Sequence, residues 1–169
     1  SQYFPNSLVR RENQDQSTAR PIREAITELK GQIILIADSG LGKTMFLKDL
    51  VSRNRHVTVF LPAWKCEDGV LEAIQAKLHG PAKDADYLRT LIYAGAIDIC
   101  IDGVNEVSPD TREKIRSFVE NFFKGNIILT CQPIDWRSPS TTESWYLEPL
   151  TEDQIEEFLI TRPLDIFFC

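Results

Sequence analysis

The sequence is poor in the residues that build zinc sites and disulfide frameworks. It contains only 4 cysteines and 2 histidines among 169 residues. No two cysteines form a C-x-x-C pair, and neither histidine lies near a cysteine. We therefore expect neither a zinc site nor a disulfide framework. Cysteines scattered through apolar runs favour a reducing compartment, so we expect the protein in the cytoplasm.

Long apolar runs and an excess of positive charge are also missing. No apolar segment approaches the ~20 residues that span a bilayer, so we expect no membrane partner. Lys and Arg total 19 against 25 Asp and Glu, which gives a net charge of −6. Because phosphate backbones attract basic faces, we do not expect direct nucleic-acid binding. The chain does not begin with Met, and we expect it to be an excised piece of a longer protein.

The sequence does contain short β-branched runs that alternate with helical stripes. Residues 1–20 are polar and irregular, which predicts a lead-in or linker before one domain at 21–169. The pair Ser108-Pro109 predicts a helix start, with Ser as the cap. Strand-like runs lie at 33–37, 56–61, 97–101, 127–130 and 145–147. This alternation predicts an α/β fold around a parallel sheet.

The most specific motif is Ala-Asp-Ser-Gly-Leu-Gly-Lys-Thr at 37–44. It matches the phosphate-loop pattern G-x-x-x-x-G-K-[ST] between a strand and a helix, except that Ala replaces the first Gly. Gly40 and Gly42 let backbone N–H groups turn inward around a phosphate. Lys43 would contact the β- and γ-phosphates as a catalytic residue, and Thr44 would ligate Mg²⁺. The nucleotide-binding residues expected in this loop are Ala37, Asp38, Ser39, Gly40, Leu41, Gly42, Lys43 and Thr44. The alternative is a glycine turn before an ordinary surface lysine.

A carboxylate at the end of a neighbouring strand would complete such a site. Asp102 ends the apolar run Ile-Asp-Ile-Cys-Ile-Asp at 97–102, so we expect it to ligate Mg²⁺. Glu106 follows four residues later and could act as a general base on an attacking water. The alternative for Asp102 is a turn residue after a strand. We expect Asp98, within the strand, to face the surface or mark the start of the strand.

The run at 127–130 ends in polar residues. Ligands of open parallel sheets lie at the carboxyl ends of the strands, so Thr130 and Gln132 could approach the γ-phosphate and bind the nucleotide. An ordinary polar turn before Pro133 is an equal alternative.

These segments together resemble the NACHT group of signal-transduction P-loop NTPases, relatives of the AAA-type ATPases. The phosphate loop at 37–44 and Ile-Cys-Ile-Asp-Gly-Val-Asn-Glu at 99–106 carry the resemblance. Weaker support comes from Asn-Ile-Ile-Leu-Thr-Cys-Gln-Pro at 126–133 and from the segment 147–159. Two positions depart from the pattern: Asn105 stands where many members have an acid, and Gln132 where many have Arg.

The resemblance implies a three-layer P-loop NTPase core: a five-stranded parallel sheet of order 5-1-4-3-2 with helices on both faces. It implies ATP or GTP bound with Mg²⁺, and ADP in the resting state. Nucleotide exchange would let the larger protein self-associate and signal. A winged-helix region would follow the core, and we expect this chain to stop before it.

We therefore expect a nucleotide-binding switch that hydrolyses ATP or GTP slowly, in innate immunity or phage defence. One alternative is a motor-type ATPase that acts on DNA or protein. Such a motor would need an arginine from a neighbouring subunit, for which Arg112, Arg116 and Arg137 are the candidates. The other alternative is a pseudo-NTPase that binds partners without turnover, which the neutral Asn105 and Gln132 would allow.

Overall fold

The protein is built on one mixed sheet of seven strands. The computed structural model describes residues 8–25, 30–38, 57–78, 84–121 and 125–148, together with residues 152, 153 and 156. The strand order is β2-β1-β7-β3-β6-β5-β4, and the strands from β7 to β4 run parallel. Their bounds are β3 (Gln32–Ile36), β4 (Val57–Pro62), β5 (Ile97–Asp102), β6 (Ile127–Cys131) and β7 (Glu143–Leu147).

The expected five-stranded, all-parallel sheet is wrong. Two short strands, β1 (Leu8–Arg11) and β2 (Arg20–Pro21), extend the sheet beyond β7, and both pair antiparallel to their neighbours. They form because Val9 is fully buried beside β7, where it pairs with Leu147. The guanidinium of Arg11 lies 5.0 Å from the ring centroid of Trp145, which adds a cation–π contact. The fold remains α/β overall.

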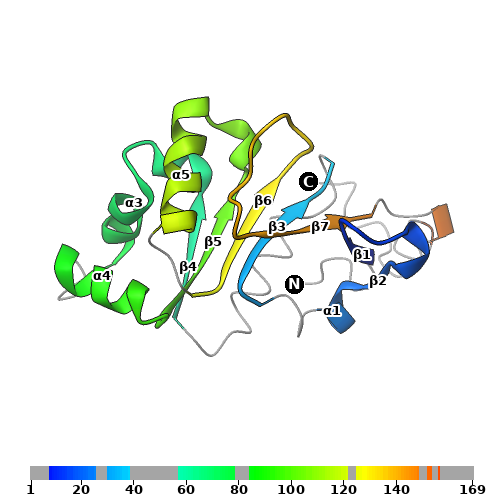
Figure 1. Ribbon diagram of the computed structural model, residues 1–169, viewed down its shortest axis with the longest axis horizontal. Helices are drawn as coiled ribbons and strands as arrows, with labels where there is room; N and C mark the ends of the chain where they lie inside the picture. The colour runs from blue at the N-terminus through cyan, green and yellow to red at the C-terminus, as the bar shows by residue number, and fades with distance from the viewer. Residues whose placement is uncertain are drawn as a thin grey trace, which may run out of the picture.

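Helices cover the sheet unevenly. Figure 1 shows α3 (Val70–Lys77), α4 (Ala85–Tyr93) and α5 (Pro109–Asn121) gathered at the β4–β6 end, and the short α1 (Ile22–Ala25) near β1. The predicted helix start at Ser108-Pro109 is confirmed, since the backbone N–H of Thr111 donates to the Ser108 hydroxyl at 3.2 Å. Single-turn 3-10 helices lie at Gln16–Thr18 (η1), Ala63–Cys66 (η3) and Val104–Glu106 (η5).

The alternating side chains of the strands divide the core into two clusters. The larger cluster joins the sheet to α3, α4 and α5 and includes Ile99, Ile101, Leu129 and Val104. The smaller cluster lies on the other face and joins Leu35, Cys100 and Trp145 to β1 and α1. Burying each of these large apolar side chains contributes about 1.5–3 kcal/mol. The register of β3, β5 and β6 places their carboxyl ends next to one another.

Candidate nucleotide site

The carboxyl ends of β3, β6 and β5 lie side by side at one edge of the sheet. Ile36 pairs with Cys131, and Ile101 pairs with Leu129. Just past β3, the backbone N–H of Ala37 donates to the carbonyl of Cys131 at 3.1 Å. The first residues of the predicted phosphate loop therefore begin next to the ends of β6 and β5. Open parallel sheets bind ligands at this edge.

Asp102 ends β5, and its carboxylate is held by a buried hydroxyl. The Thr130 hydroxyl donates to Asp102 Oδ1 at 2.5 Å and accepts the backbone N–H of Gly103 at 3.0 Å. Thr130 is fully buried, at 0% exposure, so both functions of its hydroxyl are used inside the protein. Its geometry makes it a support of Asp102 rather than a surface group facing a ligand.

A tight turn after Asp102 carries Glu106. Gly103 has φ +84°, a left-handed conformation that glycine adopts without strain. A Cβ at this position would lie 3.2 Å from the carboxyl carbon of Glu106, so only glycine fits well here. The backbone N–H of Glu106 donates to the carbonyl of Gly103 at 2.9 Å and closes the turn η5. Val104 anchors the turn in the core while Glu106 is exposed.

Asn105 and Gln132, the two positions that depart from the NACHT pattern, touch each other. The backbone N–H of Gln132 donates to the side-chain carbonyl of Asn105 at 3.0 Å. Both residues are half-buried. The contact joins the turn after β5 to the end of β6, and the sequence did not indicate it. In the sequence, the signal for this contact is an Asn three residues after the Asp that ends the strand.

The remaining predicted site residues divide into described and undescribed ones. Ala37 is buried and Asp38 is exposed at the end of β3. The rest of the predicted phosphate loop, including Lys43 and Thr44, lies outside the described residues. Among the described ones, the structure brings together Asp102, Thr130 and Gln132 at the edge where Ala37 begins the loop.

The donor chemistry at this edge fits Mg²⁺. Carboxylate oxygen is a hard donor, and Mg²⁺ commonly takes one or two carboxylates while phosphates and waters complete its shell. Asp102 is half-buried at the strand end, where such an ion would lie. Within the described residues no three His, Cys, Asp or Glu side chains are grouped to hold a metal. Asp102 is the described carboxylate at this end of β5, and Thr44, the expected second ligand, lies outside the described residues.

Two buried cysteines, Cys100 and Cys66, have thiol pKa values well above the ordinary one. Cys100 lies between Asp98 and Asp102 on the same face of β5 and is buried. Burial, reinforced by the two carboxylates, raises the pKa of its thiol to about 12. Burial alone raises the pKa of the Cys66 thiol to the same value, about 12. Both thiols stay protonated at neutral pH and behave as small apolar side chains.

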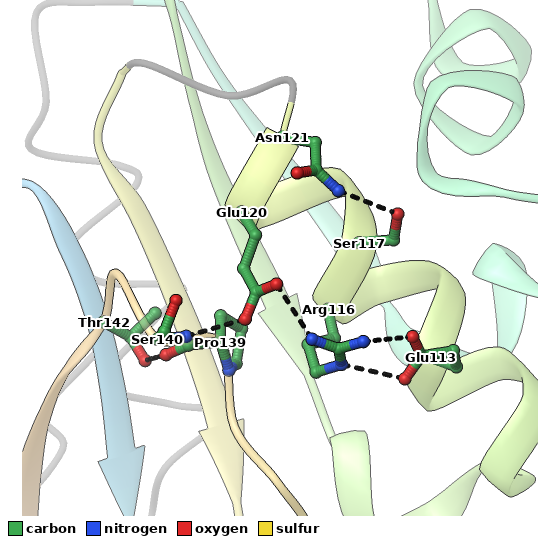
Figure 2. Close-up of polar contacts among 8 residues, drawn as sticks. All are labelled: Glu113, Arg116, Ser117, Glu120, Asn121, Pro139, Ser140 and Thr142. Atoms are coloured by element: carbon green, nitrogen blue, oxygen red, sulfur yellow. Dashed lines mark hydrogen bonds and ion pairs between the residues drawn. The ribbon is translucent and has the colours of Figure 1, made fainter.

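Two of the three candidate trans-acting arginines are engaged within the chain. Arg116 lies between Glu113 and Glu120 on α5, and Glu120 in turn accepts the backbone N–H of Ser140 at 2.8 Å (Figure 2). Arg112 donates from Nε to the carbonyl of Val107 at 3.1 Å. Arg137 is exposed on the segment between β6 and β7.

A separate hollow of about 1000 Å³ lies among α3, α4 and α5. Its lining mixes apolar side chains such as Ile92 and Phe118 with charged ones. Lys114 and Asp110, both in the lining, form an ion pair at 3.3 Å. Among the predicted site residues that the structure describes, none lines this hollow, so it is separate from the candidate site at the strand ends.

Comparison with solved structures gives distant likenesses. A solved structure described as the structural basis for DNA unwinding at forked double-stranded DNA by two coordinating Pif1 helicases is 20% identical, with a TM-score of 0.44. The match covers 83% of this chain, which spans about a third (36%) of the helicase chain. At that score the likeness carries no argument about function. No family profile and no curated protein matches the chain. In the part of the chain that the structure describes, no helix is long and apolar enough to cross a membrane.

Proposed function

We propose that the chain binds a nucleoside triphosphate with Mg²⁺ at the carboxyl ends of β3, β5 and β6 and hydrolyses it slowly. One observation carries the proposal. Asp102 is fixed by the fully buried Thr130 at the sheet edge where the phosphate-loop sequence begins. A carboxylate that is oriented by a buried hydroxyl is preorganised to hold a cation. The sequence Gly-Leu-Gly-Lys-Thr at 40–44 supplies the complementary phosphate-binding chemistry.

The residues of the chain would divide the work as follows. Lys43 and the loop amides would bind the phosphates. Thr44 and Asp102 would hold Mg²⁺, which neutralises phosphate charge when bound. Glu106, exposed on the turn that begins beside Asp102, would orient a water for attack on the terminal phosphate.

The finer function rests on the resemblance to the NACHT group. We propose that ATP or GTP binding, with ADP in the resting state, controls self-association of a larger cytoplasmic protein in innate immunity or phage defence. The neutral side chains at Asn105 and Gln132 support slow turnover, because neither supplies a fixed charge. Slow turnover suits a switch, since the triphosphate state then persists long enough to signal.

Titration with fluorescent ATP and GTP, with and without Mg²⁺, tests the proposal. Lys43→Ala should abolish Mg-nucleotide binding because it removes the phosphate contact of the loop. Lys30→Ala is the matched control, since Lys30 is exposed just before β3 at the opposite end of the strand. It should bind like the wild type. Unchanged affinity in Lys43→Ala would show that the loop is not a phosphate site.

A further inference from the structure

The segment between β6 and β7, residues 132–142, is hydrogen-bonded near each of its ends to the part of the chain that runs from β5 through α5. At the near end, Gln132 donates its backbone N–H to the side chain of Asn105. At the far end, Ser140 donates its backbone N–H to Glu120, which Arg116 also contacts at 2.8 Å (Figure 2). The Asn105–Gln132 hydrogen bond lies at the candidate nucleotide site, and the Glu120–Ser140 hydrogen bond lies at the end of α5.

The Asn105–Gln132 hydrogen bond holds the turn that carries Glu106. The Glu106 side chain is exposed, and the turn is held by its neighbouring residues Val104 and Asn105. Val104 is buried on the helical side, and Asn105 reaches the end of β6. The Thr130 hydroxyl makes its hydrogen bonds just before the turn, to the Asp102 carboxylate and the Gly103 N–H. Val104 therefore holds the turn by packing, and Asn105 adds the directional contact, a hydrogen bond to the end of β6.

The chemistry of Asn105 suits this position. Its carbonyl oxygen accepts the Gln132 N–H, whereas alanine offers no acceptor. An aspartate would keep the acceptor, so its carboxylate can replace the amide in this one contact. Removing the acceptor takes away the partner of the Gln132 N–H and weakens the hold of the turn on the end of β6.

We propose that Asn105 is a positioning residue, which holds the Glu106 turn against the end of β6 so that Glu106 faces the terminal phosphate. This inference rests on the proposed NTPase function and assigns it one further residue. Asn105 acts through Glu106 and does not itself bind the nucleotide. Its loss should therefore slow the chemical step and leave binding unchanged.

The test measures turnover and nucleotide affinity separately in three variants of the whole chain. Asn105→Ala should lower kcat by about 10- to 100-fold, as expected when a supporting partner of an active group is lost, and leave the Kd for Mg-ATP unchanged. Asn105→Asp keeps the acceptor and should turn over at least as fast as the wild type. Glu120→Ala is the matched control, because it removes the hydrogen bond to Ser140 near the other end of the same segment. It should keep the wild-type kcat.

The outcomes separate this inference from the proposed function. A wild type that neither binds nor hydrolyses Mg-nucleotide overturns both. A wild type that turns over, with Asn105→Ala equal to it, overturns the positioning role alone. An equal loss of kcat in Glu120→Ala and Asn105→Ala would show that both hydrogen bonds only hold the segment in place, and it would also overturn the positioning role. A loss in Asn105→Ala that appears in Kd and not in kcat does the same.

Discussion

The two aspartates of β5 make matching contacts at opposite ends of one strand. Asp98 accepts Asn126 Nδ2 at 3.2 Å, and Asp102 accepts the Thr130 hydroxyl at 2.5 Å. In both pairs the partner lies 28 residues further along the chain, at or next to β6. Both carboxylates are on the face of β5 that also carries Cys100.

The surroundings of the two aspartates differ. At the amino end, the amide oxygen of Asn126 accepts the backbone N–H of Gly31 at 2.7 Å, so the contact of Asp98 belongs to a network that ties β3, β5 and β6 together. At the carboxyl end, Asp102 adjoins the edge from which the phosphate-loop sequence departs. The direction of the strand therefore decides which of two similar carboxylates can serve a ligand.

The largest contrast between the two ends should appear in turnover. Glu106→Gln removes the proposed base at the carboxyl end and should slow hydrolysis by about 10²- to 10⁴-fold while binding is retained. Asp98→Asn makes the same kind of change at the amino end and should leave turnover unchanged. Single-turnover hydrolysis of ATP measures both. Wild-type turnover in Glu106→Gln would show that the base assignment is wrong.

A smaller contrast concerns the support of Asp102. Thr130→Val keeps the shape of the side chain but removes the hydroxyl that holds the carboxylate, so Mg²⁺-dependent affinity should fall by about 10- to 100-fold. Thr130→Ser keeps a hydroxyl and should retain most of it. Titrating Mg²⁺ at a fixed nucleotide concentration compares them. Equal loss in both variants would mean that packing, and not the hydroxyl, supports the site.

At the amino end the expected cost is in stability alone. Asn126→Ala removes two hydrogen bonds, one to Asp98 and one from the Gly31 N–H, and should cost about 1–3 kcal/mol in the free energy of unfolding. Nucleotide affinity should not change, because this network lies at the other end of the strands. Urea denaturation gives the first quantity and a titration the second. Weakened nucleotide binding in this variant would break the contrast between the ends.

The smallest contrast compares two glycines, each with a left-handed φ. Gly31 has φ +81° with open space where a Cβ would lie, whereas the same atom at Gly103 would meet Glu106. Gly31→Ala should cost about 1–2 kcal/mol from backbone strain alone. Gly103→Ala should cost as much in urea denaturation and should also slow turnover, since it displaces Glu106. Unchanged turnover in Gly103→Ala would separate the position of Glu106 from catalysis.

The sequence located the strand that carries Asp102 because an apolar run that ends in Asp-Gly is a strong local pattern. We expected Asp98 at the surface or at the start of the strand: it is the second residue of β5, as the latter expectation placed it, but it is buried. Asp98 and Asp102 have the same parity in the run, and a hydrogen bond from Asn126, in a distant part of the chain, helps to make burial of Asp98 tolerable. Local pattern cannot supply such a partner.

The short strands β1 and β2 were missed for a different reason. They contain 4 and 2 residues, which is too few to show a period of two. Val9 is buried because β7 and Trp145 lie beside it, which is a property of the folded chain. The pairings of Thr130 with Asp102 and of Asn105 with Gln132 likewise depend on the register of β5 and β6.

The most direct test of the account is the Mg²⁺ dependence of ATP binding in Asp102→Asn and Asp98→Asn. Isothermal titration with ATP, in Mg²⁺ and in a chelator, should show that Asp102→Asn loses the gain in affinity that Mg²⁺ gives the wild type. Asp98→Asn should keep this gain, because its carboxylate lies at the other end of the strand. Equal Mg²⁺ dependence in the wild type and Asp102→Asn would contradict the assignment of the metal site to the end of β5.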